Sequence, residues 1–372
     1  MRGHRFGDFG CKETDSIFEA DSIFFAERGD GVRKAIQKVR QTLRRFRRIP
    51  IRERLWLSRN KFKPASYALY QFAGKDARER ANYISDGQAD LLHGVNTKAP
   101  AEFLRNKLVF HRLLEKTAVR VRYPTLRGVV RRQRLTAAAP PYRVTSLDAI
   151  LKDTEAVVVK PIGGFRGRGV QFVTSKGAGI DHDMGQLIPA AEKPGYDEMI
   201  IVDRIEQSHY SAEISPVSSN TVRVVCMRRP LTRELFIPIA VHRFGTQRTA
   251  PLDNFSKGGL SCAIDLETGR LGPGVMHPSK TNWSLQFAKC HPDTGVRIDG
   301  TMIPNWPRLL DDVAELMSIF PDLEFVGWDM LPVEDGWCVI EGNPLMDVDL
   351  LQVHGGLLAD DRVREFFEYH CS

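Results

Sequence analysis

A lysine that ends an apolar run and is followed by four closely spaced glycines is the feature that most restricts how this chain can fold. Residues 157–159 are valines, and their β-branched side chains favour a buried strand that carries Lys160 at its end. The glycines lie within residues 163–169, where they let the backbone bend and approach an anion closely. Residues 170–173 return as a second strand. The segment therefore predicts a hairpin flap that presents a cation and backbone N–H groups to a phosphate.

This hairpin differs from the common nucleotide-binding loops. Both G-x-x-x-x-G-K-[ST] and G-x-G-x-x-G lead from a strand into a helix, whereas here the glycines lead into another strand. A protein kinase would place its lysine after the glycine loop and would need an H-R-D motif, which the sequence lacks. A glycine-rich surface hairpin without a ligand stays open as the alternative.

Two carboxylates and an amide near the end of the chain form a second chemical group. Asp329 begins one strand-like run and Glu341 ends the next, with the turn E-D-G (334–336) between them. A three-residue loop with Gly336 in the left-handed conformation would pair the runs so that Asp329 faces Glu341. Asn343 lies two residues further on and shares their face of the sheet. The sequence therefore predicts three oxygen-bearing side chains in one place.

Facing carboxylates repel each other by tenths of a kcal/mol to about 1 kcal/mol, and a divalent cation between them would remove that cost. A ligand set made only of oxygen favours Mg2+, or Mn2+, over zinc. Asp329, Glu341 and Asn343 are therefore the predicted metal ligands. The alternative is that each carboxylate pairs with a separate arginine.

Charge is unevenly distributed along the 372 residues. Residues 1–150 hold 32 Lys and Arg against 15 Asp and Glu, a net charge of +17, whereas residues 151–372 hold 21 against 31, a net charge of −10. Residues 32–46 carry apolar side chains at helical spacing among lysines and arginines. Such a helix contacts an anionic membrane surface or an acidic substrate, or it packs on a core, and we favour packing. Nucleic acid is not an expected partner.

The apolar runs and the cysteines indicate the cellular compartment in which the chain is expected. No run approaches the ~20 apolar residues of a membrane span, and the first ten residues lack the apolar core of a signal peptide. A cytoplasmic location is therefore expected. The cysteines show no C-x-x-C spacing, so we expect reduced thiols rather than disulfides or a zinc site. They are residues 11, 226, 262, 290, 338 and 371.

Many short strands follow a largely helical first part. Residues 51–100 read as helices and loops, a helix is expected over 102–116, and an Arg- and Pro-rich connection over 120–145. The predicted class is α+β, with helices packed against antiparallel sheets. Strands are expected at 155–160, 169–174, 199–204, 220–227, 235–243, 260–266, 325–331 and 337–341, and helices at 146–152, 183–192 and 305–319.

The order and spacing of these motifs resemble the ATP-grasp superfamily, and most closely its sugar-transfer-associated group, over roughly residues 95–360. The resemblance implies two α+β lobes that clasp ATP. It divides the chain into a basic helical region (1–95), a first lobe with the flap (96–202) and a second lobe with the metal site (203–372). The resembling segments are N-K-L-V-F (106–110), V-V-V-K-P-I-G-G (157–164), I-V-D-R-I (201–205), S-N-T-V-R-V-V (219–225), D-N-F-S-K-G-G (253–259), D-L-E-T-G (265–269), H-P-D-T-G (291–295), V-G-W-D (326–329) and I-E-G-N-P (340–344).

The resemblance also implies roles for single residues in binding ATP. Lys107 and Lys160 would hold the α- and β-phosphates beneath the flap, and the backbone around Asp203 and Ile205 would bind adenine. The acidic set would bind one or two Mg2+ ions. Further candidates for nucleotide or acceptor contacts are Gly163, Gly164, Arg166, Arg168, Asn220 and Asn254.

Two assignments depend on how this chain departs from its relatives. Some relatives carry an arginine just before the first metal aspartate, where this chain has Gly327-Trp328. Arg223 is therefore the candidate for the cation that stabilises the transition state, with Lys160 as the second catalytic residue. Glu206 and Glu213 remain alternatives for the carboxylate that binds ribose.

The activity that the resemblance implies is an ATP- and Mg2+-dependent ligase. It would join a carboxylate to an amine through an acyl phosphate, on a sugar acid, an amino acid or a secondary-metabolite acid, in polysaccharide or secondary metabolite biosynthesis. The alternative is a phosphotransferase, or kinase, that passes the γ-phosphate to a sugar or alcohol hydroxyl. A nucleotide-binding scaffold docked to anionic lipid by residues 28–63 is a third possibility, against which the intact lysines and metal ligands argue.

Overall fold

The structure, a computed structural model of the full chain, describes residues 49–117, 119–131, 134–164, 167–174, 198–281 and 283–371. The amphipathic segment 32–46, Cys11, Arg166 and the helix expected at 183–192 lie outside the described residues. The chain divides into two compact units, Met1–Arg59 and Asn60–Ser372. The described part of the first unit holds helix α2 (Ile51–Arg59).

Short helices around an aromatic cluster begin the second unit. Asp76 and Ser85 each start a helix with a capping box, in which side chain and backbone bond reciprocally over three residues. The aromatic rings lie with centroids 4.9 to 6.4 Å apart. They belong to Phe62, Tyr70, Phe72 and Tyr83. The helices are α3 (Pro64–Leu69), η1 (Phe72–Gly74), α4 (Ala77–Ala81), α5 (Asp86–Leu91) and η2 (Leu92–Gly94).

The helix predicted over 102–116 is two helices, α6 (Lys98–Arg105) and α7 (Lys107–Lys116). Asn106 separates them with an extended backbone, and its side chain caps α7 by accepting a hydrogen bond from the N–H of Val109 at 3.1 Å. The break puts Lys107 at the first position of α7, where its N–H donates to the carbonyl of Ile162 at 3.0 Å. The apolar spacing runs through the break, so the cap alone marks it.

The first sheet has five antiparallel strands in the order β2-β1-β5-β3-β4. The strands predicted near 155–160, 169–174 and 199–204 are confirmed, whereas β1 and β2 lie where an irregular connection was expected. In β1, alternate residues such as Leu126 and Val130 are buried, but the arginines between and after them obscure this pattern in the sequence. The helix predicted at 146–152 is α8 (Leu147–Leu151), which packs on this sheet. The strands are β1 (Leu126–Arg131), β2 (Arg134–Ala137), β3 (Ala156–Pro161), β4 (Gln171–Thr174) and β5 (Glu198–Asp203).

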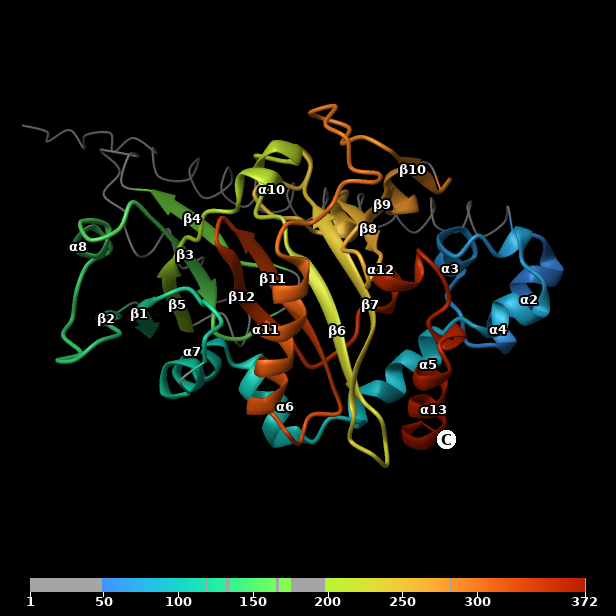
Figure 1. Cartoon of the computed structure of the whole chain (residues 1–372), viewed down its shortest axis with the longest axis horizontal. Coiled ribbons are helices and arrows are strands. Elements are labelled where there is room, and N and C mark those ends of the chain that lie inside the picture. The colour runs from blue at the N-terminus through green and yellow to red at the C-terminus, as the bar shows by residue number, and fades with distance from the viewer. Residues whose placement is uncertain are drawn as a thin grey trace, which may run out of the picture. The chain divides into compact units, whose positions relative to one another are not determined.

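The second sheet has seven antiparallel strands in the order β10-β9-β8-β7-β6-β11-β12, with β7 at its centre and β12 at one edge (Figure 1). The five strands predicted here are confirmed, and β9 and β10 are additional. The strands are β6 (Val222–Arg228), β7 (Leu235–Phe244), β8 (Leu260–Ile264), β9 (Leu271–Met276), β10 (Gln286–Ala288), β11 (Phe325–Val333) and β12 (Gly336–Asn343).

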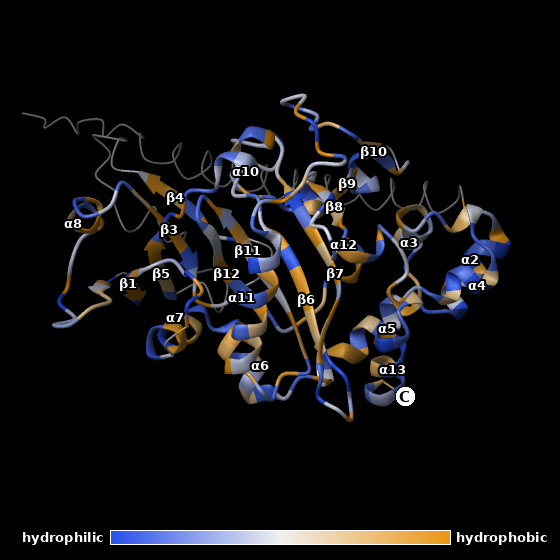
Figure 2. Ribbon diagram, viewed as in Figure 1, coloured by the Kyte–Doolittle hydropathy of each residue, from blue (hydrophilic) through white to orange (hydrophobic). Residues whose placement is uncertain are grey.

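The two faces of the second sheet differ in chemistry. One face packs against α6, α7 and α11 (Trp306–Ile319), and Val224 and Trp328 belong to that core. Since side chains alternate along a strand, Arg223 and Asp329 point to the opposite face. Along strand β6, blue hydrophilic segments accordingly interrupt the orange apolar ones (Figure 2). Helix α12 (Val348–Gln352) lies over the polar face, where Ser261 of β8 donates to the carbonyl of Leu350.

The remaining helices are short, apart from α13. In the described residues no helix is long and apolar enough to cross a lipid bilayer. These helices are α10 (His209–Ile214), η3 (Phe255–Lys257), η4 (Pro278–Lys280), η5 (Leu357–Ala359) and α13 (Asp361–His370).

The β11–β12 hairpin has the predicted pairing of Asp329 with Glu341 but a different loop length. Asp329 faces Glu341, as predicted, but the three-residue loop is wrong, because Val333 pairs with Gly336 across a two-residue loop. A bulge next to Asp329 leaves Ile340 as an extra residue of β12 and restores the pairing at Glu341. The bulge therefore decides which side chains of β12 face the polar side of the sheet.

Candidate active site

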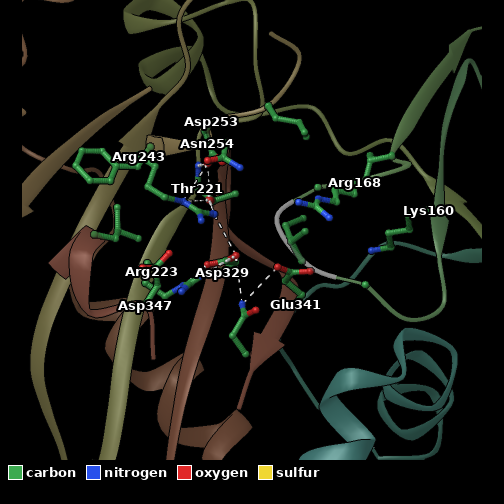
Figure 3. A pocket seen from close by; sticks show the side chains of 18 of the residues that line it. Lys160, Arg168, Thr221, Arg223, Arg243, Asp253, Asn254, Asp329, Glu341 and Asp347 are labelled. Atoms are coloured by element: carbon green, nitrogen blue, oxygen red, sulfur yellow. Dashed lines mark hydrogen bonds and ion pairs between the residues drawn. The ribbon is translucent and has the colours of Figure 1, made fainter. Parts of the chain in front are cut away.

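A cavity of about 620 Å³ lies between the two sheets. The first sheet contributes residues of β3, β4, β5 and the flap, and the second contributes residues of β6, β7, β11 and β12. Lys63, which precedes α3, and residues of α5, η2 and the segment after β12 also line it. Lys160 and Glu341, which belong to the two predicted halves of the site, line this one cavity (Figure 3).

The lysines form the basic side of the cavity. Lys160 is only 5% exposed, and burial lowers the pKa of its ammonium group to about 8, while the charge of Glu341 opposes that shift. Lys107 donates from Nζ to the carbonyl of Gly164 at 3.2 Å and so ties α7 to the flap. Gly164 has φ of 109°, a conformation that favours glycine. Gly163, Gly164, Gly167 and Arg168 complete the flap side of the lining.

The end of β5 leads from the first sheet toward the second. Arg127 of β1 binds the carboxylate of Asp203 twice, from Nε at 2.7 Å and from Nη2 at 2.9 Å. The N–H of Asp203 donates to the carbonyl of Thr125. Asp203 is thus held within the first sheet, and Ile205 beyond it lines the cavity. The apolar part of the lining is made by Val158, Phe172, Val202, Ile205, Leu331 and Ile340.

Charged side chains form a row across three neighbouring strands of the second sheet. Glu341 of β12 pairs with Asp329 of β11, and Asp329 pairs with Arg223 of β6. Asn343 Nδ2 lies 3.4 Å from an oxygen of each carboxylate (Figure 3). The structure therefore brings together the three predicted metal ligands and adds Arg223 to them.

Asp329 is held by two arginines. Arg223 donates from Nε to Oδ1 at 2.5 Å and from Nη2 to Oδ2 at 3.0 Å, and Arg243 Nη2 approaches Oδ2 at 3.1 Å. Burial alone would raise the pKa of Asp329, but the charges of Arg223 and Arg243 lower it to about 2. The pairing with arginine that was the alternative to a metal site is present at Asp329. Among the described residues, Glu341 has no ion pair.

Arg223 fills the space above Gly327. A Cβ atom at position 327 would lie 3.0 Å from Arg223 Cδ and 3.5 Å from its Nη1. The region over β11 at Gly327 is therefore occupied by an arginine from the adjacent strand β6.

Arg243 was missed by the sequence analysis. It lies on β7 opposite Ser261, lines the cavity, and is 14% exposed. Its Nε donates to Thr221 Oγ1 at 3.1 Å and lies 3.3 Å from Asp253 Oδ2. The alternation of β7 was the available signal, since His242 and Phe244 are core residues and Arg243 must point the other way.

Comparison with protein families decides the classification. A family model described as sugar-transfer associated ATP-grasp matches residues 87–366. This chain belongs to the sugar-transfer associated ATP-grasp family. The predicted ATP-grasp fold is thereby confirmed, together with its antiparallel sheets.

Solved ATP-grasp structures match with low identity. The ATP-grasp ligase PsnB, complexed with a phosphomimetic variant of its minimal precursor, Mg and ADP, is 11% identical, with a TM-score of 0.38, over 73% of this chain and 62% of that chain. VanG D-Ala:D-Ser ligase from Enterococcus faecalis is 14% identical, with a TM-score of 0.41, over 73% and 64%. A RimK domain ATP-grasp protein from Sphaerobacter thermophilus is 14% identical, with a TM-score of 0.39, over 74% and 77%. This chain spans less than two thirds of the length of the first two. No curated protein matches it.

The residues of this ATP-grasp cavity fit a magnesium ion. Mg2+ is usually bound by one or two carboxylates plus substrate phosphates and waters. Asp329, Glu341 and Asn343 supply two carboxylates and an amide, all from the same hairpin. No group of three or more His, Cys, Asp or Glu side chains with metal-binding geometry occurs within the described residues. The protein set is thus incomplete without the oxygens of a bound nucleotide.

Three predicted nucleotide contacts lie elsewhere. Asn220 is fully buried, and its amide bonds to Ser218, Gln207, the carbonyl of Ser215 and the N–H of Gly245, so it holds the turn after α10 together. Glu206 and Glu213, the two alternatives for ribose, do not line the cavity either. Asn254, by contrast, does line it, next to Asp253.

Proposed function

We propose that this chain is an ATP-dependent ligase that joins a carboxylate to an amine through an acyl phosphate. The observation that carries the proposal is the shared cavity, in which Lys160 from one sheet and the Asp329–Glu341–Asn343 set from the other line the same space. A triphosphate and its metal need these two kinds of group at once. Membership in the ATP-grasp family supports the same reading.

The nucleotide would lie with adenine in the apolar part of the cavity and its phosphates toward the lysines. Val158 and Phe172 of the first sheet and Leu331 and Ile340 of the second would contact the base. Backbone groups near Ile205 would provide its hydrogen bonds. Lys107 and Lys160, with Gly163, Gly164 and Arg168, would bind the phosphates.

Asp329, Glu341 and Asn343 would hold Mg2+, which when bound neutralises the phosphate oxygens. An oxygen of the acid would attack the γ-phosphorus, and the bond from that phosphorus to the β,γ-bridging oxygen would break to release ADP. Arg223 would stabilise the charge on the transferred phosphoryl group. The amine would then attack the acyl carbon and release phosphate. The flap would exclude the water that competes with the amine.

The substrates belong to a class rather than a single compound. A sugar acid, an amino acid or a secondary-metabolite acid fits an ATP-grasp ligase by analogy with its family. A cytoplasmic location follows from the need for ATP.

The test is incubation of the purified protein with Mg2+, ATP and pairs of acids and amines, with ADP release and product mass as readouts. We expect ADP and phosphate to form together with an amide, and hydroxylamine to trap the acyl phosphate when the amine is left out. A stable phosphorylated acceptor without amide would instead identify a kinase. Absence of ATP binding would overturn both.

A further inference from the structure

Arg243 and Arg223 lie in the same cavity but are bound in different ways. Arg223 makes two bonds to the two oxygens of Asp329, the geometry of a strong bidentate pair. Arg243 approaches Asp329 with Nη2 only. Both Nη2 and Nε donate to Thr221 Oγ1, and Nε also lies near Asp253. Among the described residues, Nη1 of Arg243 has no protein partner. Of the two cations, Arg243 is thus the one that Asp329 holds less firmly.

The oxygen that Arg243 shares is crowded. Oδ2 of Asp329 lies 3.0 Å from Arg223 Nη2, 3.1 Å from Arg243 Nη2 and 3.4 Å from Asn343 Nδ2. A carboxylate oxygen has about two lone-pair sites, so three donors exceed what it can accept. A divalent cation bound by Oδ2 would repel both guanidinium groups and displace the one of the two that Asp329 holds less firmly. By the contacts above, that donor is Arg243.

We propose that Arg243 is a second catalytic cation, which leaves Asp329 when a metal ion binds that carboxylate and then binds the γ-phosphate opposite Lys160. The proposal rests on the proposed function for the nucleotide and the metal. Thr221 and Asp253 are positioning residues that keep the far side of the guanidinium anchored, so that it turns toward the phosphate without leaving the cavity. Metal binding and phosphoryl transfer would then be coupled through one side chain.

This coupling predicts that removing Arg243 weakens binding of a γ-phosphate mimic but does not weaken binding of the metal ion. In Arg243→Ala, Asp329 keeps its bidentate partner but loses a competing positive charge, so Mn2+ should bind the ADP complex as tightly as in the wild type or several-fold tighter. The same variant should lose affinity for a γ-phosphate mimic, MgADP with fluoroaluminate, by on the order of 10- to 100-fold. Affinity for MgADP alone should stay within about twofold of the wild type, since Arg243 makes no contact with ADP in this arrangement.

Arg243→Lys is a second variant that keeps the proposal testable if Arg243→Ala does not fold. Lysine keeps the charge but loses the planar guanidinium fork. The affinity of this variant for the mimic should therefore fall between those of the wild type and Arg243→Ala. Arg131→Ala is the matched control, because it removes one arginine from an exposed ion pair with Glu198 on the first sheet. It should change none of the three affinities.

Equal weakening of Mn2+, MgADP and the mimic in Arg243→Ala would show that Arg243 only supports the structure around Asp329, and the proposal would be wrong. Wild-type affinity for the mimic in both Arg243 variants would also overturn it. A wild-type protein that binds neither MgADP nor MgATP would overturn the proposed function and this inference together. Binding of the mimic as described, without amide formation from any acid and amine, would overturn the ligase alone.

Discussion

Lys160 shows how one buried residue depends on its surroundings for its charge. The three valines before it carry the ammonium group into a cavity wall that leaves only 5% of the residue exposed. Burial lowers the pKa to about 8, because the low-dielectric surroundings disfavour the charged form. The lysine is therefore mainly charged at neutral pH and mainly neutral above about pH 8.

ADP affinity should follow this titration. In the wild type it should fall as the pH rises through about 8, since the lysine loses the charge that attracts phosphate. Lys160→Met should bind ADP on the order of 10- to 100-fold more weakly than the wild type at pH 7, and less so at higher pH. Calorimetric titration from pH 6.5 to 9.5 measures this. Lys152→Met, at an exposed position, is the control, and equal pH profiles for wild type and Lys160→Met would remove Lys160 from phosphate binding.

Asp329 and Glu341 should respond differently to neutralisation. Glu341→Gln should raise the Mg2+ concentration needed for activity sharply and leave the free energy of unfolding nearly unchanged, because Glu341 has no ion pair among the described residues. Asp329→Asn should do the same to the Mg2+ requirement and also destabilise the fold by about 3–5 kcal/mol, since it leaves the buried Arg223 without its carboxylate. Magnesium titrations and urea unfolding test both. An unchanged metal requirement in both variants would rule out the metal site.

Strand β12 carries the ligands at the scale of the element. Gly342 lies between Glu341 and Asn343 and points to the core face, where a Cβ atom would meet the ring of Trp328 at 2.6 Å and Leu104 at 3.0 Å. Only a glycine lets β12 lie this close to the ring and to α6. The position of both ligands thus depends on the packing behind them.

Gly342→Ala should therefore lower the free energy of unfolding by about 1–3 kcal/mol, the usual cost of overpacking a core. It should also weaken Mg2+ binding, since both neighbours of residue 342 are ligands in our proposal. Gly74→Ala is the matched control, because nothing lies within 4 Å of a Cβ atom there. Thermal melts and Mn2+ titration measure both effects, and a Gly342 variant indistinguishable from the control would contradict this account.

The sequence predicted strands wherever apolar side chains alternate without interruption, and failed where other groups hide the pattern. Strand β1 was missed because Arg127 and Arg131 break its apolar run, and the gap between α6 and α7 was missed because only the cap at Asn106 marks it. The facing pair Asp329–Glu341 was predicted correctly although the loop length was wrong, because the bulge at Ile340 offsets the difference.

Arg243 could not be recognised as a cavity residue from its own segment. Its position follows from which face of β7 meets the cavity, and that depends on the pairing of β6 with β7 and β11. The alternation of β7 shows only that Arg243 points away from the core. The pairing of β6 with β11 joins residues as far apart as Arg223 and Asp329, 106 positions, and the local pattern carries no record of it. The prediction that Asn220 contacts the nucleotide failed for a different reason. Its segment gave no sign that both ends of its side-chain amide would bond to the turn after α10 and to the N–H of Gly245.

At the scale of the whole molecule, the helices of residues 60–95 are part of the compact unit that contains both sheets. Gln352 of α12 is fully buried and bonds to both the N–H and the carbonyl of Ile84, at 2.7 Å and 3.0 Å. Tyr70 donates to Asp349 at 2.9 Å. The helices therefore support the segment that follows the proposed metal ligands.

A chain that begins at residue 60 should fold and bind MgATP like the full protein, whereas one that begins at residue 96 should not. The shorter chain lacks the aromatic cluster and leaves Nε2 of Gln352 without its partners Tyr70 and Ile84, at about 1–3 kcal/mol for each unpaired group. Circular dichroism melts and nucleotide binding distinguish the two. Cooperative unfolding and normal affinity in the chain from residue 96 would contradict this assignment.

The bond between Ile84 and Gln352 spans 268 positions of sequence. During translation, Lys107 and Lys160, which we propose to bind phosphate, leave the ribosome long before Glu341 and α12 emerge. A nascent or prematurely terminated chain therefore has no complete nucleotide pocket. Fragments that end before β12 are therefore expected to have no ATPase activity.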